Sequence, residues 1–216
     1  GKKEMKKLES SFKNMVLVLG SISIVAAAAL GWINELTSEP IRLAAIARQE
    51  KAIRMVSPEF DNQPVEEQFE LIDYEGNSLI CFPVKKEGKL LGVAIETFSM
   101  KGFNGEVRLM LGLKPDGSIN NYEVLKQSET PGLGTQMTYW FKTDKNNQSI
   151  LNKDPGKDKV WVDKDGGDID AITAATITSR AFLDAVDRAY RAYMEHGGTV
   201  VDVVTTATIE EKEAQK

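Results

Sequence analysis

The longest apolar run of the chain lies near its N-terminus, at residues 15–33, and contains no charged side chain. A helix of this length rises about 28 Å, close to the hydrocarbon thickness of a bilayer. Lysines precede the run, whereas Glu35 and Glu39 follow it. Because basic residues stay on the cytoplasmic side, this order predicts a single transmembrane helix with a cytoplasmic N-terminus and an exported body. The lipid bilayer is therefore an expected partner.

Two other interpretations of the run are weaker. A buried core helix at a chain end beside lysines would show a polar face, but this run is apolar on every side. A signal peptide would fit the small residues Ala26–Ala29, although the chain retains the segment. We interpret residues 15–33 as an anchor and residues 1–14 as its basic cytoplasmic flank. Met5 is a candidate native start, with Gly1–Glu4 as a remnant of something else.

Helical spacing returns within residues 34–56. Pro40 stands where a helix can begin, because proline is tolerated in the first turn of a helix. Ser57-Pro58 is expected to end this helix. We predict a membrane-proximal helix from Pro40 to about Met55 that packs on the following domain. Its apolar side consists of Leu43, Ala44, Ala47 and Ile53.

From Glu67 to Lys126 the apolar period changes to two, which is typical of strands. Short turns, most of them with glycine, separate the apolar segments, as in hairpins. Such links imply a mostly antiparallel sheet whose apolar face needs at least one covering helix. The expected strands are Phe69–Tyr74, Ser78–Val84, Leu90–Phe98, Glu106–Leu113 and Ile119–Leu125.

A second amphipathic helix is predicted toward the C-terminus, ending at Gly197-Gly198. Its apolar residues recur at three- and four-residue spacing: Ala181, Phe182, Ala185, Val186, Ala189, Tyr190 and Tyr193. The sequence therefore predicts one α+β domain at residues 57–200, behind a single N-terminal transmembrane helix, and a charged C-terminal tail at residues 201–216.

Charge and composition exclude several kinds of function. Residues 1–14 hold five lysines and two glutamates, whereas the rest of the chain carries 22 basic and 30 acidic residues. An acidic domain argues against a nucleic-acid partner. Cys81 is the only cysteine, which excludes an internal disulfide and an iron–sulfur ligand set. His196 is the only histidine, which argues against a Ser-His-Asp triad and against a two-histidine metal site.

The stretch at residues 165–180 joins an acidic, glycine-bearing loop to the start of the C-terminal helix. It carries the hydroxyls of Thr173, Thr176, Thr178 and Ser179, and the small residues Ala174 and Ala175. A helix start offers free N–H groups and a positive dipole end, which favour an anionic group such as phosphate. The alternative is that these hydroxyls only cap the helix.

A second candidate is the loop at residues 129–134, which has the sequence Glu-Thr-Pro-Gly-Leu-Gly. Pro131 and the two glycines predict a tight loop whose backbone can approach a ligand closely. A plain surface turn before a short helix is the alternative. Trp140, just behind the loop, could line a flat ligand pocket, but a large aromatic behind a loop is more often part of the core.

Three motifs in this order behind one anchor resemble the FMN-binding G subunit of Rnf electron-transport complexes. They are Glu-Thr-Pro-Gly-Leu-Gly at 129–134, Asp-Gly-Gly-Asp-x-Asp at 165–170 and Thr-Ala-Ala-Thr-Ile-Thr-Ser at 173–179. The C subunit of the Na⁺-translocating NADH:quinone oxidoreductase is similar and is the alternative within this class. The short chain without a large insert favours the Rnf subunit.

The resemblance implies FMN held covalently, its phosphate esterified to the last threonine of a Ser-Gly-Ala-Thr signature, which is Thr176 here. Thr173 replaces the serine of that signature and keeps a hydroxyl for the phosphate. Ala174 replaces its glycine and would be strained if the turn needs a positive φ. The chain shows no residue set that could activate phosphoryl transfer, so a separate flavin transferase is an expected partner.

The remaining cofactor-binding residues follow from the same resemblance. The loop would lie against the isoalloxazine ring, with backbone groups tuning its redox state. The cofactor-binding residues that we expect are Glu129, Thr130, Pro131, Gly132, Leu133, Gly134, Thr173, Ala174, Ala175, Thr176 and Thr178. Asp165, Asp168 and Asp170 are expected to shape their loop. A calcium loop counted from Asp163 would place Gly167 and Ala174 where oxygen ligands belong, so we do not predict calcium.

These observations predict an electron-relay subunit inside a multisubunit ion-translocating complex, not an independent catalyst. The overall reaction implied for Rnf is electron transfer between ferredoxin and NAD⁺, coupled to Na⁺ or H⁺ movement. The domain would lie outside the cytoplasmic membrane, beside other membrane and peripheral subunits. The competing hypotheses are a flavin-free membrane-tethered scaffold and an FMN-based redox sensor, but no output module for a sensor is visible.

Overall fold

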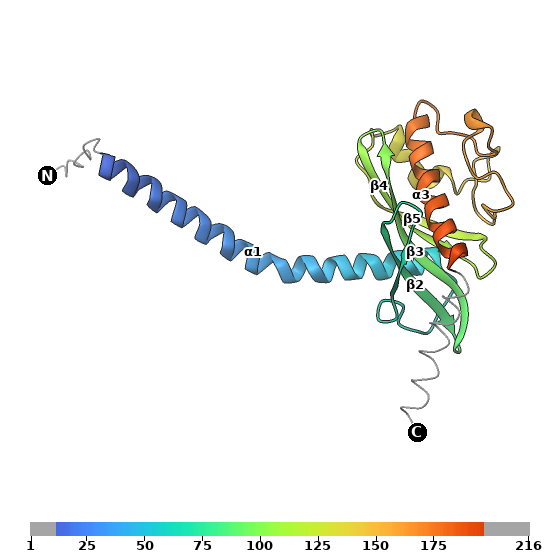
Figure 1. Cartoon of the computed structure of the whole chain (residues 1–216), viewed down its shortest axis with the longest axis horizontal. Helices are drawn as coiled ribbons and strands as arrows, with labels where there is room; N and C mark the ends of the chain where they lie inside the picture. Colours follow the sequence, from blue (N-terminus) through green and yellow to red (C-terminus); the bar gives the residue numbers. More distant parts are fainter. Residues whose placement is uncertain (1–11, 197–216) are drawn as a thin grey trace, which may run out of the picture. The chain divides into compact units, whose positions relative to one another are not determined.

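The computed structural model describes residues 12–196, and within them it contains a long N-terminal helix and an α+β domain (Figure 1). The chain divides into two compact units between Arg48 and Gln49. The predictions for the first eleven residues, for the Gly197-Gly198 helix stop and for the tail at 201–216 lie outside the described residues.

Helix α1 runs from Phe12 to Val56 without a break. Its apolar part is long enough to cross a membrane by length and composition, and its large side chains are exposed, with Ile24 71 % and Trp32 68 % accessible. The structure differs from the prediction of a separate helix that begins at Pro40, because Pro40 lies inside α1. Proline lacks an N–H, so the cost of this arrangement is confined to one backbone hydrogen bond and local crowding.

The domain is built on a five-stranded sheet in the order β1-β2-β3-β4-β5, with every neighbouring pair antiparallel. This confirms the predicted antiparallel sheet, and the observed bounds lie within a few residues of the predicted ones. The strands are β1 Phe69–Ile72, β2 Ser78–Lys86, β3 Lys89–Gly102, β4 Gly105–Leu113 and β5 Ile119–Lys126.

Helix α3, at Thr176–Glu195, covers one face of the sheet (Figure 1). The residues predicted for its apolar side are buried, except Tyr190, which is half-buried. Phe182 lies at the centre of this core, stacked on Phe141 at 4.4 Å and edge-on to Tyr122 at 4.7 Å between ring centroids. Two polar contacts also hold α3: the Thr97 hydroxyl donates to the Ala185 carbonyl at 2.8 Å, and Arg188 pairs with Asp73.

The opposite face of the sheet packs on the last turns of α1. Ala52, Ile53 and Val56 are buried there against side chains of β2, β3 and β4 such as Phe82 and Met110. The domain therefore has three layers: the end of α1, the sheet, and α3.

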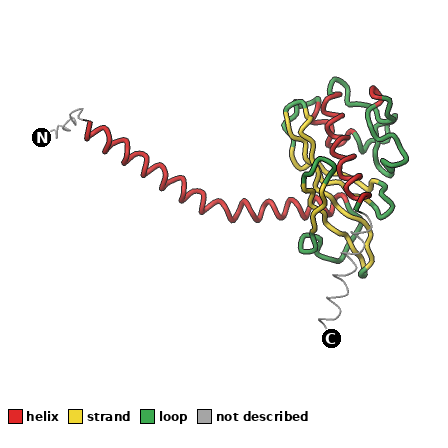
Figure 2. Tube along the Cα trace, viewed as in Figure 1, coloured by secondary structure: helices red, strands yellow, loops and turns green. Residues whose placement is uncertain are grey.

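The segment between β5 and α3 is mostly loop (Figure 2). Its short helices are η1 Gly134–Gln136, α2 Met137–Trp140 and η2 Asp163–Asp165. Trp140 packs against the core, and its indole N–H donates to the Asp170 carbonyl at 2.9 Å, which agrees with the expectation that it is a core residue.

Candidate functional site

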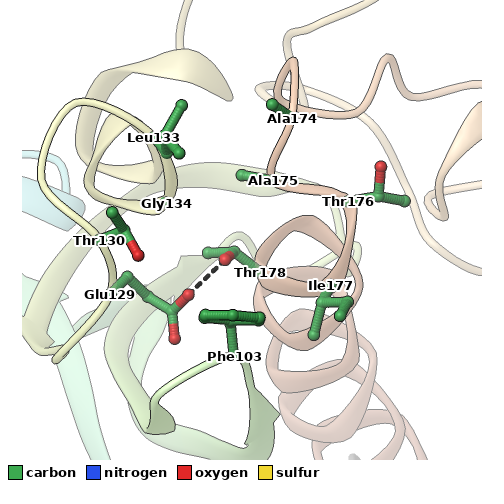
Figure 3. A pocket seen from close by; sticks show the side chains of 10 residues that line it. All are labelled: Phe103, Glu129, Thr130, Leu133, Gly134, Ala174, Ala175, Thr176, Ile177 and Thr178. Carbon is green, nitrogen blue, oxygen red and sulfur yellow. Dashed lines mark hydrogen bonds between the residues drawn. The ribbon is translucent and has the colours of Figure 1, made fainter.

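The two candidate motifs meet at an open pocket of about 430 Å³ beside the start of α3. This volume lies in the range of small-molecule sites. Figure 3 shows that the loop after β5 forms one side of the pocket and the start of α3 the other. The lining residues are Phe103, Glu129, Thr130, Leu133, Gly134, Ala174, Ala175, Thr176, Ile177 and Thr178.

The loop at 129–134 folds tightly, as predicted from its proline and glycines. The Leu133 N–H donates to the Thr130 carbonyl at 3.1 Å, and Gly132 has φ +75°. Glu129, Thr130, Leu133 and Gly134 line the pocket, whereas Pro131 and Gly132 form the exposed turn and do not. The turn therefore shapes the pocket without forming its wall.

Glu129 is 4 % exposed, and its carboxylate joins the loop to two other segments. It accepts a hydrogen bond from the Asn104 N–H at 3.0 Å and another from the Thr178 hydroxyl (Figure 3). Gly134 packs against the same pair, since a Cβ there would lie 2.7 Å from the Glu129 Cβ. The carboxylate thus holds the pocket's shape from within its lining.

The start of α3 carries no side-chain cap, and its N-cap residue is Ala175. The hydroxyls of this segment form other hydrogen bonds: Thr178 donates to Glu129, and Ser179 donates to the Ala175 carbonyl at 3.0 Å. The interpretation that these hydroxyls only cap the helix is therefore wrong. Without a side-chain cap, the helix start keeps its positive dipole end and free N–H groups for an anion.

Ala174 adopts the left-handed conformation, with φ +61°. It sits third in a turn closed by the Ala175 N–H, which donates to the Ile172 carbonyl at 3.0 Å. Glycine is the usual residue at such a position, because it has no Cβ to crowd the backbone. The turn thus needs a positive φ. Thr173 is exposed in the same turn and does not line the pocket.

The acidic loop of residues 163–170 folds back against the start of α3. Asp165 forms a bidentate pair with Arg180 at 2.7 and 2.8 Å, and the guanidinium holds the pKa of this carboxyl below its usual value. Asp170 accepts from the Asn147 N–H at 3.1 Å. Lys164 directly precedes Asp165, and its ammonium donates a hydrogen bond to the Thr176 hydroxyl at 2.9 Å.

Three pocket or rim residues were missed from the sequence. Phe103 is 64 % exposed at the β3–β4 turn, and a large aromatic in a glycine-flanked turn was an available signal. Ile177 is 47 % exposed in the first turn of α3. Lys164 gave no signal, because its contact with Thr176 depends on how the acidic loop folds.

Every residue that lines the pocket lies within a stretch that a known family model matches. The family model described as FMN-binding domain matches residues 102–191, which include all three motifs. The chain is 30 % identical over 195 residues to the G subunit of the ion-translocating oxidoreductase complex of Shewanella piezotolerans, covering 87 % of this chain and 92 % of the relative. It is 32 % identical over 181 residues to the G subunit of the same complex in Haemophilus influenzae, covering 80 % and 85 %.

A shorter match to the G subunit from Aliivibrio fischeri is 38 % identical over 116 residues, about half of each chain. The resemblance inferred from the three motifs is thus confirmed. One apolar N-terminal helix also fits a membrane-anchored subunit of such a complex. The chain belongs to the family of G subunits of ion-translocating oxidoreductase complexes.

Proposed function

We propose that this chain carries FMN in the pocket at the start of α3, esterified through its phosphate to Thr176, and relays electrons within an ion-translocating redox complex. One observation is the main support for this proposal. Two motifs far apart in sequence, at residues 129–134 and 173–179, contribute to a single pocket with Thr176 among its lining residues.

The pocket has the chemistry that the two ends of FMN require. Phe103, Leu133 and Ile177 offer apolar side chains from three separate segments to a flat ring (Figure 3). The uncapped helix start and the ammonium of Lys164 offer positive charge to a phosphate. Esterification leaves the phosphate with one negative charge, which these groups can balance.

Bound FMN would supply reversible uptake and release of electrons. The protein's part is to hold the ring in the pocket and to keep the phosphate end fixed at Thr176. Attachment needs a separate flavin transferase with a flavin dinucleotide as donor: the Thr176 Oγ–P bond forms, the pyrophosphate P–O bond breaks and the adenylate leaves. The hydroxyl proton passes to a base on the transferase.

In the membrane, α1 would anchor the chain with its N-terminus in the cytoplasm and its domain on the outer side. The lysines before residue 15 and the acidic residues after residue 33 support this orientation. The partners would be the other membrane and peripheral subunits of the complex. Its overall reaction would be electron transfer between ferredoxin and NAD⁺, coupled to movement of Na⁺ or H⁺.

The test is whether flavin is bound covalently at the predicted threonine. Full-length protein purified from its native host should remain yellow after acid precipitation, and its intact mass should exceed the sequence mass by one FMN less one water. Thr176→Val should abolish both signals. Thr138→Val is the matched control, because it removes an exposed hydroxyl outside the pocket and outside the three motifs, and it should keep both.

Two results would contradict the proposal. A colourless precipitate with no mass gain, in a host that contains the transferase, would favour the flavin-free scaffold. Retention of the FMN mass by Thr176→Val would place the attachment on another residue.

A further inference from the structure

Two consecutive residues of η2 contact the same side of α3, one helical turn apart. Lys164 donates to the Thr176 hydroxyl at 2.9 Å, and Asp165 pairs with Arg180 through two hydrogen bonds. Thr176 and Arg180 are four residues apart, so they lie on one side of the helix. The bidentate Asp165–Arg180 pair therefore fixes the place from which Lys164 reaches Thr176.

The loop after η2 is shaped to allow this approach. Gly166 ends η2 with φ +84°, and Gly167 lies so close to the next segment that a Cβ would come within 2.0 Å of the Trp161 carbonyl oxygen. The Gly167 N–H then donates to the Val162 carbonyl at 3.0 Å. The two glycines thus let the chain turn back and hold Lys164 against the start of α3.

The charge of Lys164 is not neutralised by a neighbour. Its two flanking carboxylates are engaged elsewhere, since Asp165 pairs with Arg180 and Asp163 accepts from the Ala171 N–H at 3.2 Å. Among residues 12–196, no ion pair of Lys164 is formed, and no other basic side chain makes a hydrogen bond or ion pair with a residue that lines the pocket. A cation held at a hydroxyl with no carboxylate partner is suited to an anion attached at that hydroxyl.

We infer that Lys164 is the phosphate-binding residue of the site and that its ammonium speeds attachment of the flavin to Thr176. This rests on the proposed function. When Oγ becomes the ester oxygen, phosphorus is bonded directly to the atom that Lys164 already contacts, and the charged oxygens lie two bonds from that atom. The ammonium then opposes the negative charge on the phosphoryl group as the Oγ–P bond forms and the bond to the adenylate breaks. The Asp165–Arg180 pair acts as a positioning device for this lysine.

The test compares attachment rates in full-length, detergent-solubilised protein given FAD and a purified flavin transferase, followed by intact mass. Lys164→Gln should attach flavin on the order of fivefold more slowly, because a partly exposed charge-assisted hydrogen bond is lost. Lys164→Arg should restore most of the rate. Lys159→Gln is the matched control, since Lys159 is an exposed lysine of the same segment outside the pocket, and it should attach at the wild-type rate.

A second readout, taken after attachment is complete, does not depend on how fast the transferase works. Flavin attachment should raise the thermal midpoint of the wild type more than that of Lys164→Gln, while the two unloaded proteins melt together. Equal rates and equal midpoint gains in wild type and Lys164→Gln would overturn the inference. So would an equal slowing in Lys159→Gln, which would indicate general charge attraction to the transferase. If the wild type itself gains no FMN mass, the proposed function fails and this inference fails with it.

Discussion

At the scale of single residues, Ala174 is the clearest departure from what the backbone prefers. Its φ of +61° is left-handed. In this conformation the Cβ of an alanine crowds the following carbonyl oxygen, which costs about 1–2 kcal/mol. The surrounding contacts hold it there: the Ile172 N–H donates to the Ser179 hydroxyl oxygen at 2.9 Å, and Ser179 donates to the Ala175 carbonyl. The strained turn is thus fixed to the helix that follows it.

Replacing Ala174 with glycine should therefore stabilise the domain. We expect Ala174→Gly to raise the free energy of unfolding by roughly 0.5–1 kcal/mol, because the strain that is relieved exceeds the extra chain entropy of glycine. Ala175→Gly is the control, since Ala175 has φ −136° and is buried, and it should destabilise. Thermal unfolding of the full-length protein in detergent measures both. A loss of stability in Ala174→Gly would contradict this account of the turn.

At the scale of elements, a buried ion pair joins α3 to the β1–β2 turn. Arg188 is 2 % exposed and pairs with Asp73, with Glu75 at 2.8 Å as a second partner. Burial by itself raises the pKa of the Asp73 carboxyl, but hydrogen bonds from the Asn77 and Glu75 N–H groups and from Arg188 more than offset it. The net effect is a pKa below the usual value.

Asp73→Asn should cost about 3 kcal/mol at neutral pH, because it leaves the buried guanidinium without its closest carboxylate. A pKa that is lower in the folded state means that the ionised carboxylate stabilises the fold above the unfolded pKa of about 3.9, and that this contribution disappears as pH falls through the folded value. The difference between wild type and variant should therefore shrink below about pH 4.

The matched control is Asp187→Asn, the same change in an exposed pair with Arg191 on α3, where the side chains of Arg191 and Asp187 are 59 % and 38 % accessible. Such a pair contributes about 0.3–0.5 kcal/mol. Unfolding measured across pH gives both values. Equal costs for the two variants at neutral pH would show that the buried pair does not hold α3 to the sheet.

At the scale of the whole molecule, α1 changes its surroundings along its length. Large apolar side chains such as Leu17 and Ile24 are exposed, whereas Ile53 and Val56 are buried in the domain. The amide groups of two asparagines cap the helix end, Asn120 to the Val56 carbonyl at 2.7 Å and Asn121 to the Met55 carbonyl at 2.8 Å. The last turns of α1 are therefore part of the domain.

This division predicts where the chain can be shortened. A chain that begins at Gln49 should be soluble without detergent and should unfold cooperatively, since it keeps Ala52, Ile53 and Val56. A chain that begins after Val56 should lose more than about 3 kcal/mol, because it exposes Phe82 and Met110 on the sheet. Sedimentation with membranes and thermal unfolding measure these outcomes. Equal stability of the two truncated chains would contradict this account of the fold.

Much of the fold was predictable because its signals are local. The alternation of apolar residues in Phe69–Leu125 predicted the strands of the sheet. The helical spacing from Ala181 to Tyr193 predicted α3 and the side chains on its buried side. The continuous helix through Pro40 was missed, because the rule that proline begins a helix outweighed the helix formers on both sides.

The site was only partly predictable for a related reason. The motif threonines and loop glycines could be read from the sequence. The hydrogen bond from Thr178 to Glu129 joins residues 49 positions apart, and the contact of Lys164 with Thr176 joins residues 12 positions apart. Such pairs depend on how the long segment before α3 folds, and no periodic pattern encodes that fold.

The most direct test of the central claim is to locate the flavin within the chain. Trypsin should release residues 165–180 as one peptide, because it cleaves after Lys164 and Arg180, and this peptide contains Thr173, Thr176, Thr178 and Ser179. Fragmentation of the peptide from native-host protein should place the mass of one FMN less one water on Thr176. An unmodified peptide from yellow protein, or the added mass on another of its hydroxyls, would contradict the proposed attachment.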